Sequence, residues 1–237
     1  MKYWTRSWNC LYGCTKLRAG CTNCWALAMA TRMQGNGLLD GVVDAKGAWT
    51  GKIVYKPERL DMPRHWKTPQ IVAVDWMSDI FHKDVPFDVW PATLRVMSDT
   101  PQHTYLILTK RYWELLHRLY PQDATENIYI GVTISNQKDA DEAGEALFWA
   151  STTGWKTWVS FEPALEMVNW HGFGFLDGMV CGGESGTGAR PMPIEAAREA
   201  RDYCINEYIP FTFKQFGPRG MGAELDAEHY QEFPNAL

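Results

Sequence analysis

Residues 128–150 read IYIGVTISNQKDADEAGEALFWA, and this stretch contains the repeating unit of the fold. Its first seven residues form an apolar, β-branched run, which is typical of a strand buried on both faces. Three polar residues follow, and apolar side chains then recur at helical spacing over Lys138–Ala150. We expect the inward face of this helix to consist of Ala140, Ala143, Leu147 and Phe148. The stretch therefore predicts a buried strand, a polar turn and a covering helix.

The same unit recurs on both sides of this stretch. The expected strands are Ile71–Trp76, Tyr105–Leu108, Ile128–Ile134, Thr157–Phe161, Gly178–Cys181 and Phe211–Lys214. The expected helices are Trp25–Met33, a helix capped by Asp88 that runs to Ser98, Tyr112–Leu119, Lys138–Ala150 and Pro193–Tyr208. Apolar strands that alternate with helices predict an α/β fold with a parallel sheet covered by helices. We expect a partial or full parallel β/α barrel, with an open doubly wound sheet as the alternative.

One segment breaks the alternation. Gly35–Trp66 contains glycine-rich turns, an expected hairpin around Trp49–Tyr55 and a short helix from Pro57. We interpret it as an insertion, at about residues 35–66, in a single domain that covers residues 1–237.

Polar side chains follow each expected strand. They are Met77-Ser78-Asp79, Thr109-Lys110-Arg111, Ser135-Asn136-Gln137, Glu162-Pro163, Gly182-Gly183-Glu184-Ser185 and Lys214-Gln215. In parallel α/β folds the carboxyl ends of the strands form the binding face. Six polar endings in equivalent positions therefore predict one site assembled from all of them.

The composition excludes some classes of protein. The 237 residues contain no run of about 18 apolar residues, which a membrane-spanning helix needs. No apolar signal-like region follows the first charged residues, so we expect a soluble, cytoplasmic protein with no membrane partner. The net charge of −5 argues against coating nucleic acid by bulk electrostatics, but it allows a local basic groove.

Four of the six cysteines fall within the first 24 residues, at positions 10, 14, 21 and 24. Clustered cysteines in a cytosolic protein indicate a metal site or catalysis. Four thiolates would suit a closed structural zinc site. Three thiolates on a [4Fe–4S] cluster would leave one iron without a protein ligand. The spacing alone is compatible with both.

The chain resembles a phage-borne, three-cysteine family of radical-SAM-like proteins, known mainly as a domain of unknown function. The motifs that carry the resemblance are Trp8-Asn9, Gly13-Cys14-Thr15-Lys16, Gly20-Cys21-x-Asn23-Cys24, Met77-Ser78-Asp79-x-Phe81-His82, Thr109-Lys110-Arg111, Gly131-Val132, Asn136-Gln137, Phe161-Glu162-Pro163, Gly182-Gly183-Glu184-Ser185-Gly186, Ala189-Arg190-Pro191 and Phe213-Lys214-Gln215. They extend over nearly the whole chain. Together they form a specific pattern, whereas single pieces such as Gly-Gly-Glu would be weak.

The resemblance implies that Cys14, Cys21 and Cys24 hold a [4Fe–4S] cluster, while Cys10 lies outside the pattern. The spacing C-x6-C-x2-C departs from the C-x3-C-x2-C of most radical SAM enzymes. The implied activity is reductive cleavage of S-adenosylmethionine (SAM) to a 5′-deoxyadenosyl radical, for which an electron donor is a necessary partner.

The phage association suggests a substrate and a location. The expected substrate is a nucleic-acid base or nucleotide, and the expected reaction modifies or isomerises a (hyper)modified nucleobase in phage DNA. A phage-encoded enzyme would work in the host cytoplasm. Two alternatives stay open, namely a zinc-stapled α/β module that binds nucleic acid or protein, and a radical SAM enzyme for a small metabolite or peptide.

Chemistry and strand-end position together assign roles to the polar residues. For the cofactor, Ser78 and Asp79 would accept from the SAM ammonium group, and Lys110 would pair with the SAM carboxylate. Glu162 would hold a ribose hydroxyl or the substrate. Gly182 and Gly183 would allow close approach of adenine or ribose, and Glu184 would add an acceptor. For an anionic substrate such as a nucleotide phosphate, the candidates are Asn136, Arg190, Lys214 and Gln215, with arginine offering a bidentate fork. We expect packing or capping roles for His82, His103, Cys181 and Cys204.

Overall fold

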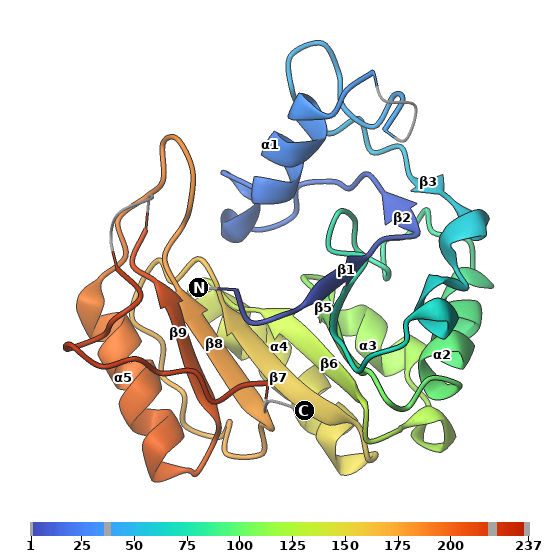
Figure 1. Cartoon of the computed structure of the whole chain (residues 1–237). Coiled ribbons are helices and arrows are strands. Elements are labelled where there is room, and N and C mark those ends of the chain that lie inside the picture. The colour runs from blue at the N-terminus through green and yellow to red at the C-terminus, as the bar shows by residue number, and fades with distance from the viewer. Residues whose placement is uncertain (1, 36–38, 218–221, 235–237) are drawn as a thin grey trace.

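The computed structural model describes residues 2–35, 39–217 and 222–234. Seven parallel strands form the main sheet in the spatial order β1-β4-β5-β6-β7-β8-β9. They are β1 (Arg6–Trp8), β4 (Ile71–Val74), β5 (Thr104–Thr109), β6 (Ile128–Thr133), β7 (Lys156–Phe161), β8 (Gly178–Gly182) and β9 (Phe211–Gln215). Because each strand lies beside the next one along the chain, the sheet curls in one direction into a half-barrel (Figure 1). The predicted partial β/α barrel is confirmed, and the doubly wound alternative is wrong because that topology reverses its strand order.

Four helices cover the outer face of the half-barrel (Figure 1). They are α2 (Val89–Ser98), α3 (Tyr112–Arg118), α4 (Gln137–Thr152) and α5 (Ile194–Asn206). Their apolar faces and the outward side chains of the strands form the largest core cluster. Asn136 caps α4, since its Oδ1 accepts a hydrogen bond of 2.8 Å from the backbone N–H of Asp139.

The predicted inward face of α4 is correct except at one position. Ala140, Ala143 and Leu147 are buried, whereas Phe148 is 55% exposed. Phe148 lies about 100° further round the helix than Leu147. Its ring packs against Phe175, with 5.5 Å between the ring centroids.

Aromatic side chains fill the inner face of the half-barrel. Trp158, Tyr3 and Phe233 belong to a buried cluster on this face. A Cβ atom on Gly131 would collide with the Trp158 indole, and one on Gly178 would collide with the Phe233 ring. Both glycines are therefore required by close packing. Since Gly178 begins β8, Phe233 lies near the amino ends of the strands, opposite the predicted site.

The first strand of the sheet was not predicted. β1 pairs with β4 at the edge of the sheet, with Ser7 opposite Ala73. Its three residues, Arg-Ser-Trp, are too few and too polar to give a strand signal.

The segment Gly35–Trp66 differs in part from the prediction. Residues 36–38 of this segment lie outside the described residues. The expected hairpin around Trp49–Tyr55 is wrong, because β3 (Val54–Tyr55) pairs antiparallel with β2 (Leu11–Tyr12). The short helix expected from Pro57 is present as the 3-10 helix η2 (Pro57–Arg59), and a second 3-10 helix, η3 (Met62–His65), follows it.

Another 3-10 helix, η1 (Ala19–Cys21), precedes α1 (Trp25–Arg32), which packs on the chain around Leu39 and Val42. A further 3-10 helix, η4 (Pro121–Asp123), follows α3. Nowhere in the described ranges is there a helix with the length and apolar character needed to cross a membrane.

Candidate active site

A cavity of about 310 Å³ opens at the carboxyl ends of the strands. Every strand from β4 to β9 contributes residues from its end, and the chain around residues 14–26 contributes the facing wall. The lining residues from the strand ends include Ser78, Asp79, Thr109, Lys110, Arg111, Thr133, Ser160, Glu162, Gly183, Glu184, Lys214 and Gln215. Five of the six predicted polar endings therefore meet in one place. No residue of the other ending, Ser135-Asn136-Gln137, is among the described lining residues, and Thr133 lines the cavity at the end of β6 instead.

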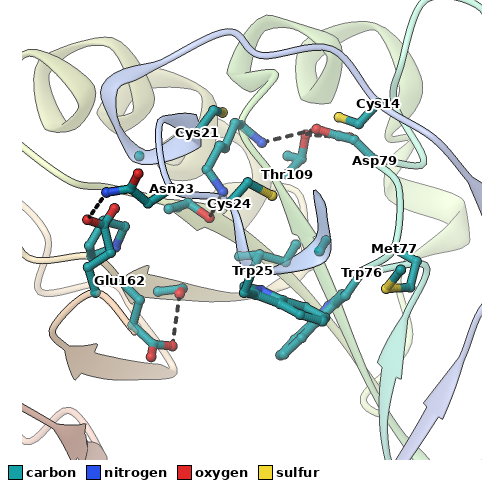
Figure 2. A pocket seen from close by; sticks show the side chains of 18 of the residues that line it. Cys14, Cys21, Asn23, Cys24, Trp25, Trp76, Met77, Asp79, Thr109 and Glu162 are labelled. Atoms are coloured by element: carbon teal, nitrogen blue, oxygen red, sulfur yellow. Dashed lines mark hydrogen bonds between the residues drawn. The ribbon is translucent and has the colours of Figure 1, made fainter. Parts of the chain in front are cut away.

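Three thiols line this cavity. We call residues Cys14–Cys24 the cysteine loop; it lies with α1 over the open side of the half-barrel (Figure 1). Cys14, Cys21 and Cys24 are free thiols that contribute to the cavity wall (Figure 2). Among the described residues, no three His, Cys, Asp or Glu side chains converge as the ligands of a single ion would.

The donor set suits a group that takes several soft ligands. Thiolates are the protein ligands of iron–sulfur clusters, and these three thiols line one shared space. Burial raises the pKa of Cys14 to about 11, and the nearby Asp79 carboxylate adds to this rise, while Arg111 opposes it. Ligation would therefore displace a proton from this thiol. The three residues fit a cluster with three protein ligands.

Cys10 does not contribute to this cavity. Its side chain is 1% exposed and lies in the main core. Its backbone N–H donates a hydrogen bond of 2.6 Å to Oδ1 of Asp75, which fixes the start of β2. A closed four-sulfur zinc site would need this thiol at the loop, so the geometry favours the three-cysteine set.

Asp79 joins two strand ends to one another, and Ser78 holds the chain just before the cysteine loop. Oδ1 of Asp79 accepts from Oγ1 of Thr109 at 2.9 Å (Figure 2). Oδ2 accepts from the backbone N–H of Lys110 at 3.3 Å. Ser78 donates through Oγ to the carbonyl of Gly13 at 2.6 Å. Both side chains line the cavity, and both are already engaged in holding its wall.

The predicted cationic and acidic groups are present in the cavity as well. Nζ of Lys110 donates to the neutral hydroxyl of Thr133 at 3.1 Å. Oε1 of Glu162 pairs with Nζ of Lys214 at 2.7 Å, and Oε2 accepts from the hydroxyl of Tyr3 at 3.0 Å. Burial, together with the neighbouring Glu162 carboxylate, raises the pKa of Tyr3 well above its usual value. Tyr3 therefore stays a neutral donor.

Glu184 accepts hydrogen bonds from other residues of the protein. Its carboxylate accepts from Nδ2 of Asn23 at 2.7 Å and from the backbone N–H and Nε of Arg190 at 2.9 and 3.0 Å. Burial alone would raise the pKa of Glu184, but the hydrogen bonds from Arg190 and Asn23 outweigh it and lower the pKa. Nη2 of Arg190 also donates to the carbonyl of Ala19 at 3.1 Å. Glu184 and Arg190 thus fasten the cysteine loop to the end of β8.

Some predicted site residues are not brought to the cavity. Asn136, Gly182 and Arg190 are absent from its described lining, and Asn136 serves as the cap of α4. Gly183 lines the cavity, but a Cβ atom there would collide with the backbone carbonyl of Phe216. The approach of a neighbouring backbone therefore explains this glycine without a ligand.

Packing roles account for the histidines and the two distant cysteines. His82 and His103 are fully buried and hydrogen-bonded, His82 through Nε2 to Thr15 and His103 through Nδ1 to Gln70. Cys181 and Cys204 are fully buried in the main core. These expectations agree with the structure.

The sequence did not indicate which aromatic residues belong to the site. The cavity is also lined by Tyr3, Trp4, Trp25, Trp49 and Trp76. Trp4 and Trp76 pack edge to face, with 4.8 Å between their ring centroids. Its position could have indicated that Trp76 belongs to the site, because it lies two residues after the end of β4. Tyr3 and Trp4 gave no such signal, since they precede β1, which was itself missed.

Arg111, the last residue of the Thr109-Lys110-Arg111 motif, also lines the cavity, although the sequence predicted no role for it. Its Nη2 donates to Oγ1 of Thr15 at 2.9 Å, and its Nε lies 3.6 Å from Oδ2 of Asp79. It therefore adds a half-buried positive charge beside Cys14.

Comparison with known proteins bears on the family and the fold. The model of the family described as "Protein of unknown function (DUF5131)" matches residues 1–234. No curated protein matches the sequence. Two solved structures of spore photoproduct lyase, a cysteine-to-serine and a tyrosine-to-phenylalanine variant, each match with 13% identity and a TM-score of 0.50, and cover 75% of this chain and 55% of that chain. A further variant, solved with AdoMet and dinucleoside spore photoproduct, matches with 14% identity and a TM-score of 0.47 over 74% of this chain and 55% of that chain.

This chain spans about half the length of these solved proteins. At such low identity the likeness shows the fold alone, a parallel β/α half-barrel.

Proposed function

Because the chain belongs to the family described as protein of unknown function (DUF5131), whose members carry no assigned activity in that description, we propose its function from the site itself. We propose a radical SAM enzyme in which Cys14, Cys21 and Cys24 hold a [4Fe–4S] cluster. One observation carries this proposal: three free thiols share a single cavity with the polar ends of six parallel strands. Once reduced by an external one-electron donor, such a cluster would supply the electron that splits bound SAM into methionine and a 5′-deoxyadenosyl radical.

The residues of the chain would bind and orient SAM. The ammonium Nζ of Lys110, held by a neutral hydroxyl, suits the SAM carboxylate. The carboxylate of Asp79 and the hydroxyl of Ser78 lie on the same wall and suit the SAM amino group. Glu162 keeps acceptor capacity beyond its present partners, because a carboxylate offers about four lone-pair sites. It would accept from a ribose hydroxyl.

The walls of the cavity suit a flat, aromatic substrate. Trp4, Trp76 and Trp25 offer ring faces, and bases of every type stack on such faces. Lys214 and Gln215 add donors at the end of β9 for a phosphate or a base edge. We therefore propose a nucleobase substrate, most specifically a (hyper)modified base in phage DNA whose attached group is modified or isomerised. A cytoplasmic location, with an electron donor as partner, belongs to the same proposal.

Anaerobic purification tests the proposal at its first step. The expected result is a brown protein with about four irons, absorption near 400 nm and bleaching on reduction, as thiolate-held clusters show. A colourless protein that retains one zinc ion per chain would refute it.

A second assay addresses the substrate. Reconstituted enzyme with a chemical reductant is incubated with SAM and with phage DNA, host DNA, nucleosides or peptides, and 5′-deoxyadenosine release is measured. We expect release to rise with one of the DNA or nucleoside samples. Release that rises only with peptides would contradict a base substrate.

A further inference from the structure

The spacer between Cys14 and Cys21 contains a side chain that leaves the cavity wall and binds the scaffold behind it. Nε of Arg18 donates to the carbonyl of Lys110 at 2.8 Å. Nη1 of Arg18 donates to Oε2 of Glu142 at 2.7 Å and to Oδ1 of Asp139 at 3.2 Å. The Arg18 guanidinium also lies over the ring of Tyr112, 3.9 Å from its centroid. One side chain thus connects the cysteine loop to the end of β5 and to helices α3 and α4.

Asp139 and Tyr112, two of the partners of Arg18, are held by contacts that do not involve the cysteine loop. Asp139 is buried, its backbone N–H is capped by Asn136, and its Oδ2 accepts from the backbone N–H of Ser135 at 3.1 Å. Tyr112 is fully buried and donates to the carbonyl of Thr133. This acidic and aromatic seat suits the planar, forked guanidinium, which can donate in several directions at once. Lysine, with one compact ammonium group, cannot reproduce these contacts.

Arg18 lies between two of the thiols in the sequence, so its contacts restrain the backbone that connects Cys14 to Cys21. Arg18 stands in the middle of the six-residue spacer, which is the feature that sets this chain apart from the shorter spacing of most radical SAM enzymes. The Arg18 side chain is only 13% exposed, so its contacts with Asp139, Glu142 and Tyr112 are largely shielded from solvent. The same side chain holds the backbone of Lys110, whose Nζ points into the cavity wall at Thr133.

We infer that Arg18 is the positioning residue of the cysteine loop: it seats the six-residue spacer on Asp139, Glu142 and Tyr112 so that Cys21 faces the cavity in register with Cys14. This inference rests on the proposed function for the use to which the thiols are put. The seating itself does not depend on iron.

The test compares Arg18→Gln with wild type in the metal-free full chain. Alkylation of each cysteine is followed over time by peptide mass spectrometry under reducing, native conditions. Cys21 reports on the loop, and the fully buried Cys204 reports on global unfolding in the same molecule. We expect Cys21 to react about tenfold faster in the variant, because several charge-assisted hydrogen bonds are lost. The rate at Cys204 should stay unchanged.

A matched control is Arg198→Gln. Arg198 also makes paired contacts with two carboxylates, Asp226 and Glu195, but it lies on α5 away from the loop. It should leave the rates of both cysteines at the wild-type level. Should Arg18→Gln fail to fold, Arg18→Lys provides the same comparison, since it keeps the charge and loses the fork.

The same variants are then reconstituted with iron. We expect Arg18→Gln to retain less iron per chain and to change the electron paramagnetic resonance spectrum of whatever cluster remains. An unchanged Cys21 rate, or equal acceleration of Cys21 and Cys204, would overturn the inference. If wild type itself binds no iron, the proposed function fails, while the alkylation rates still decide whether Arg18 seats the loop.

Discussion

Asn23 and Glu184 are 161 positions apart in the sequence, yet Nδ2 of Asn23 donates a hydrogen bond of 2.7 Å to Oε2 of Glu184. Asn23 precedes a cavity-lining thiol directly, and Glu184 follows β8. Together with Arg190, which donates to the Ala19 carbonyl, this contact fastens the second half of the cysteine loop. Arg18 fastens the first half, so the loop is held at both ends of η1.

Glu184→Ala should loosen this attachment. The Glu184 side chain is 4% exposed, and its removal leaves the donors of Asn23 and Arg190 without their acceptor. Because Arg190 is about one-third exposed, water recovers part of the loss, and we expect a destabilisation of about 2 kcal/mol. Urea unfolding measures it. Glu195→Ala is the control: this surface partner of Arg198 is 61% exposed and should cost about 0.5 kcal/mol or less. Equal effects of the two variants would contradict this role for Glu184.

Single cysteine substitutions separate the thiols of the site from the thiol of the core. Cys21→Ala should abolish cluster assembly, since a cavity-lining ligand is lost. Cys10→Ala should retain the cluster and lower the free energy of unfolding by about 1 kcal/mol, because it removes a small buried group. Iron analysis after anaerobic reconstitution and urea unfolding give the two readouts. Loss of iron in the Cys10 variant would show that the ligand set is wrong.

The fold could be predicted from the sequence because its signal is local. The pattern of apolar residues within β6 predicts a strand, and their spacing within α4 predicts a helix. The exceptions also have physical causes. β1 is held by pairing with β4 rather than by its own side chains, and β3 finds its partner in β2, which is more than 40 residues away in the chain.

The location of the site could be predicted from the sequence, but the role of each residue in it could not. Parallel strands bring their carboxyl ends together, so Asp79, Lys110 and Glu162 could be assigned to one cavity from the sequence alone. A sequence does not say whether a polar side chain already has a partner in the protein. Glu184 and Arg190 looked like ligand-binding groups, but each satisfies the other and the cysteine loop.

Asp75 should make stability depend on pH near neutrality. Burial raises the pKa of this carboxyl to about 7, although backbone hydrogen bonds from Leu11 and Cys10 lower it. The folded protein therefore keeps a proton that the unfolded chain has released, and stability falls as the pH rises from about 4 to about 7. Above that range both states are deprotonated, and the loss is complete.

Asp75→Asn should remove this dependence. Asparagine has the shape of the protonated acid, can accept the same two backbone hydrogen bonds and tolerates the φ of 53° at this position. We expect variant and wild type to be equally stable near pH 4, and the variant to be more stable at pH 8 by up to about 4 kcal/mol. Urea unfolding of both proteins across this range gives the difference. A difference that does not change with pH would contradict the titration of Asp75.

Gly131→Ala should disturb the inner face of the half-barrel. The new methyl group would push against the Trp158 indole, whose Nε1 donates to the carbonyl of Ile107 at 3.0 Å. We expect a destabilisation of about 1–3 kcal/mol from overpacking, measured by urea unfolding. Gly144→Ala is the control, because a Cβ atom there meets only ordinary contact with Phe173 and alanine favours the interior of α4. It should be neutral or stabilising by up to about 1 kcal/mol, and a loss in that variant would refute the packing argument.

Trp25 offers a test of the nucleobase proposal that does not require turnover. It lies at the start of α1, lines the cavity and is 45% exposed, so its ring face is open to a ligand. Base stacking on an aromatic side chain contributes about 1–3 kcal/mol, and Trp25→Ala should therefore weaken binding of a single-stranded oligonucleotide by about tenfold.

Fluorescence anisotropy with the reconstituted protein under anaerobic conditions measures this affinity. Trp113→Ala is the matched control, since Trp113 is 54% exposed on α3 and is not among the described cavity-lining residues. Both variants should unfold within about 0.5 kcal/mol of wild type, because neither indole is part of the core. If the two substitutions weaken binding equally, contact with the oligonucleotide is non-specific. If neither does, the aromatic wall serves a different substrate, and the peptide arm of the SAM-cleavage assay becomes the decisive comparison.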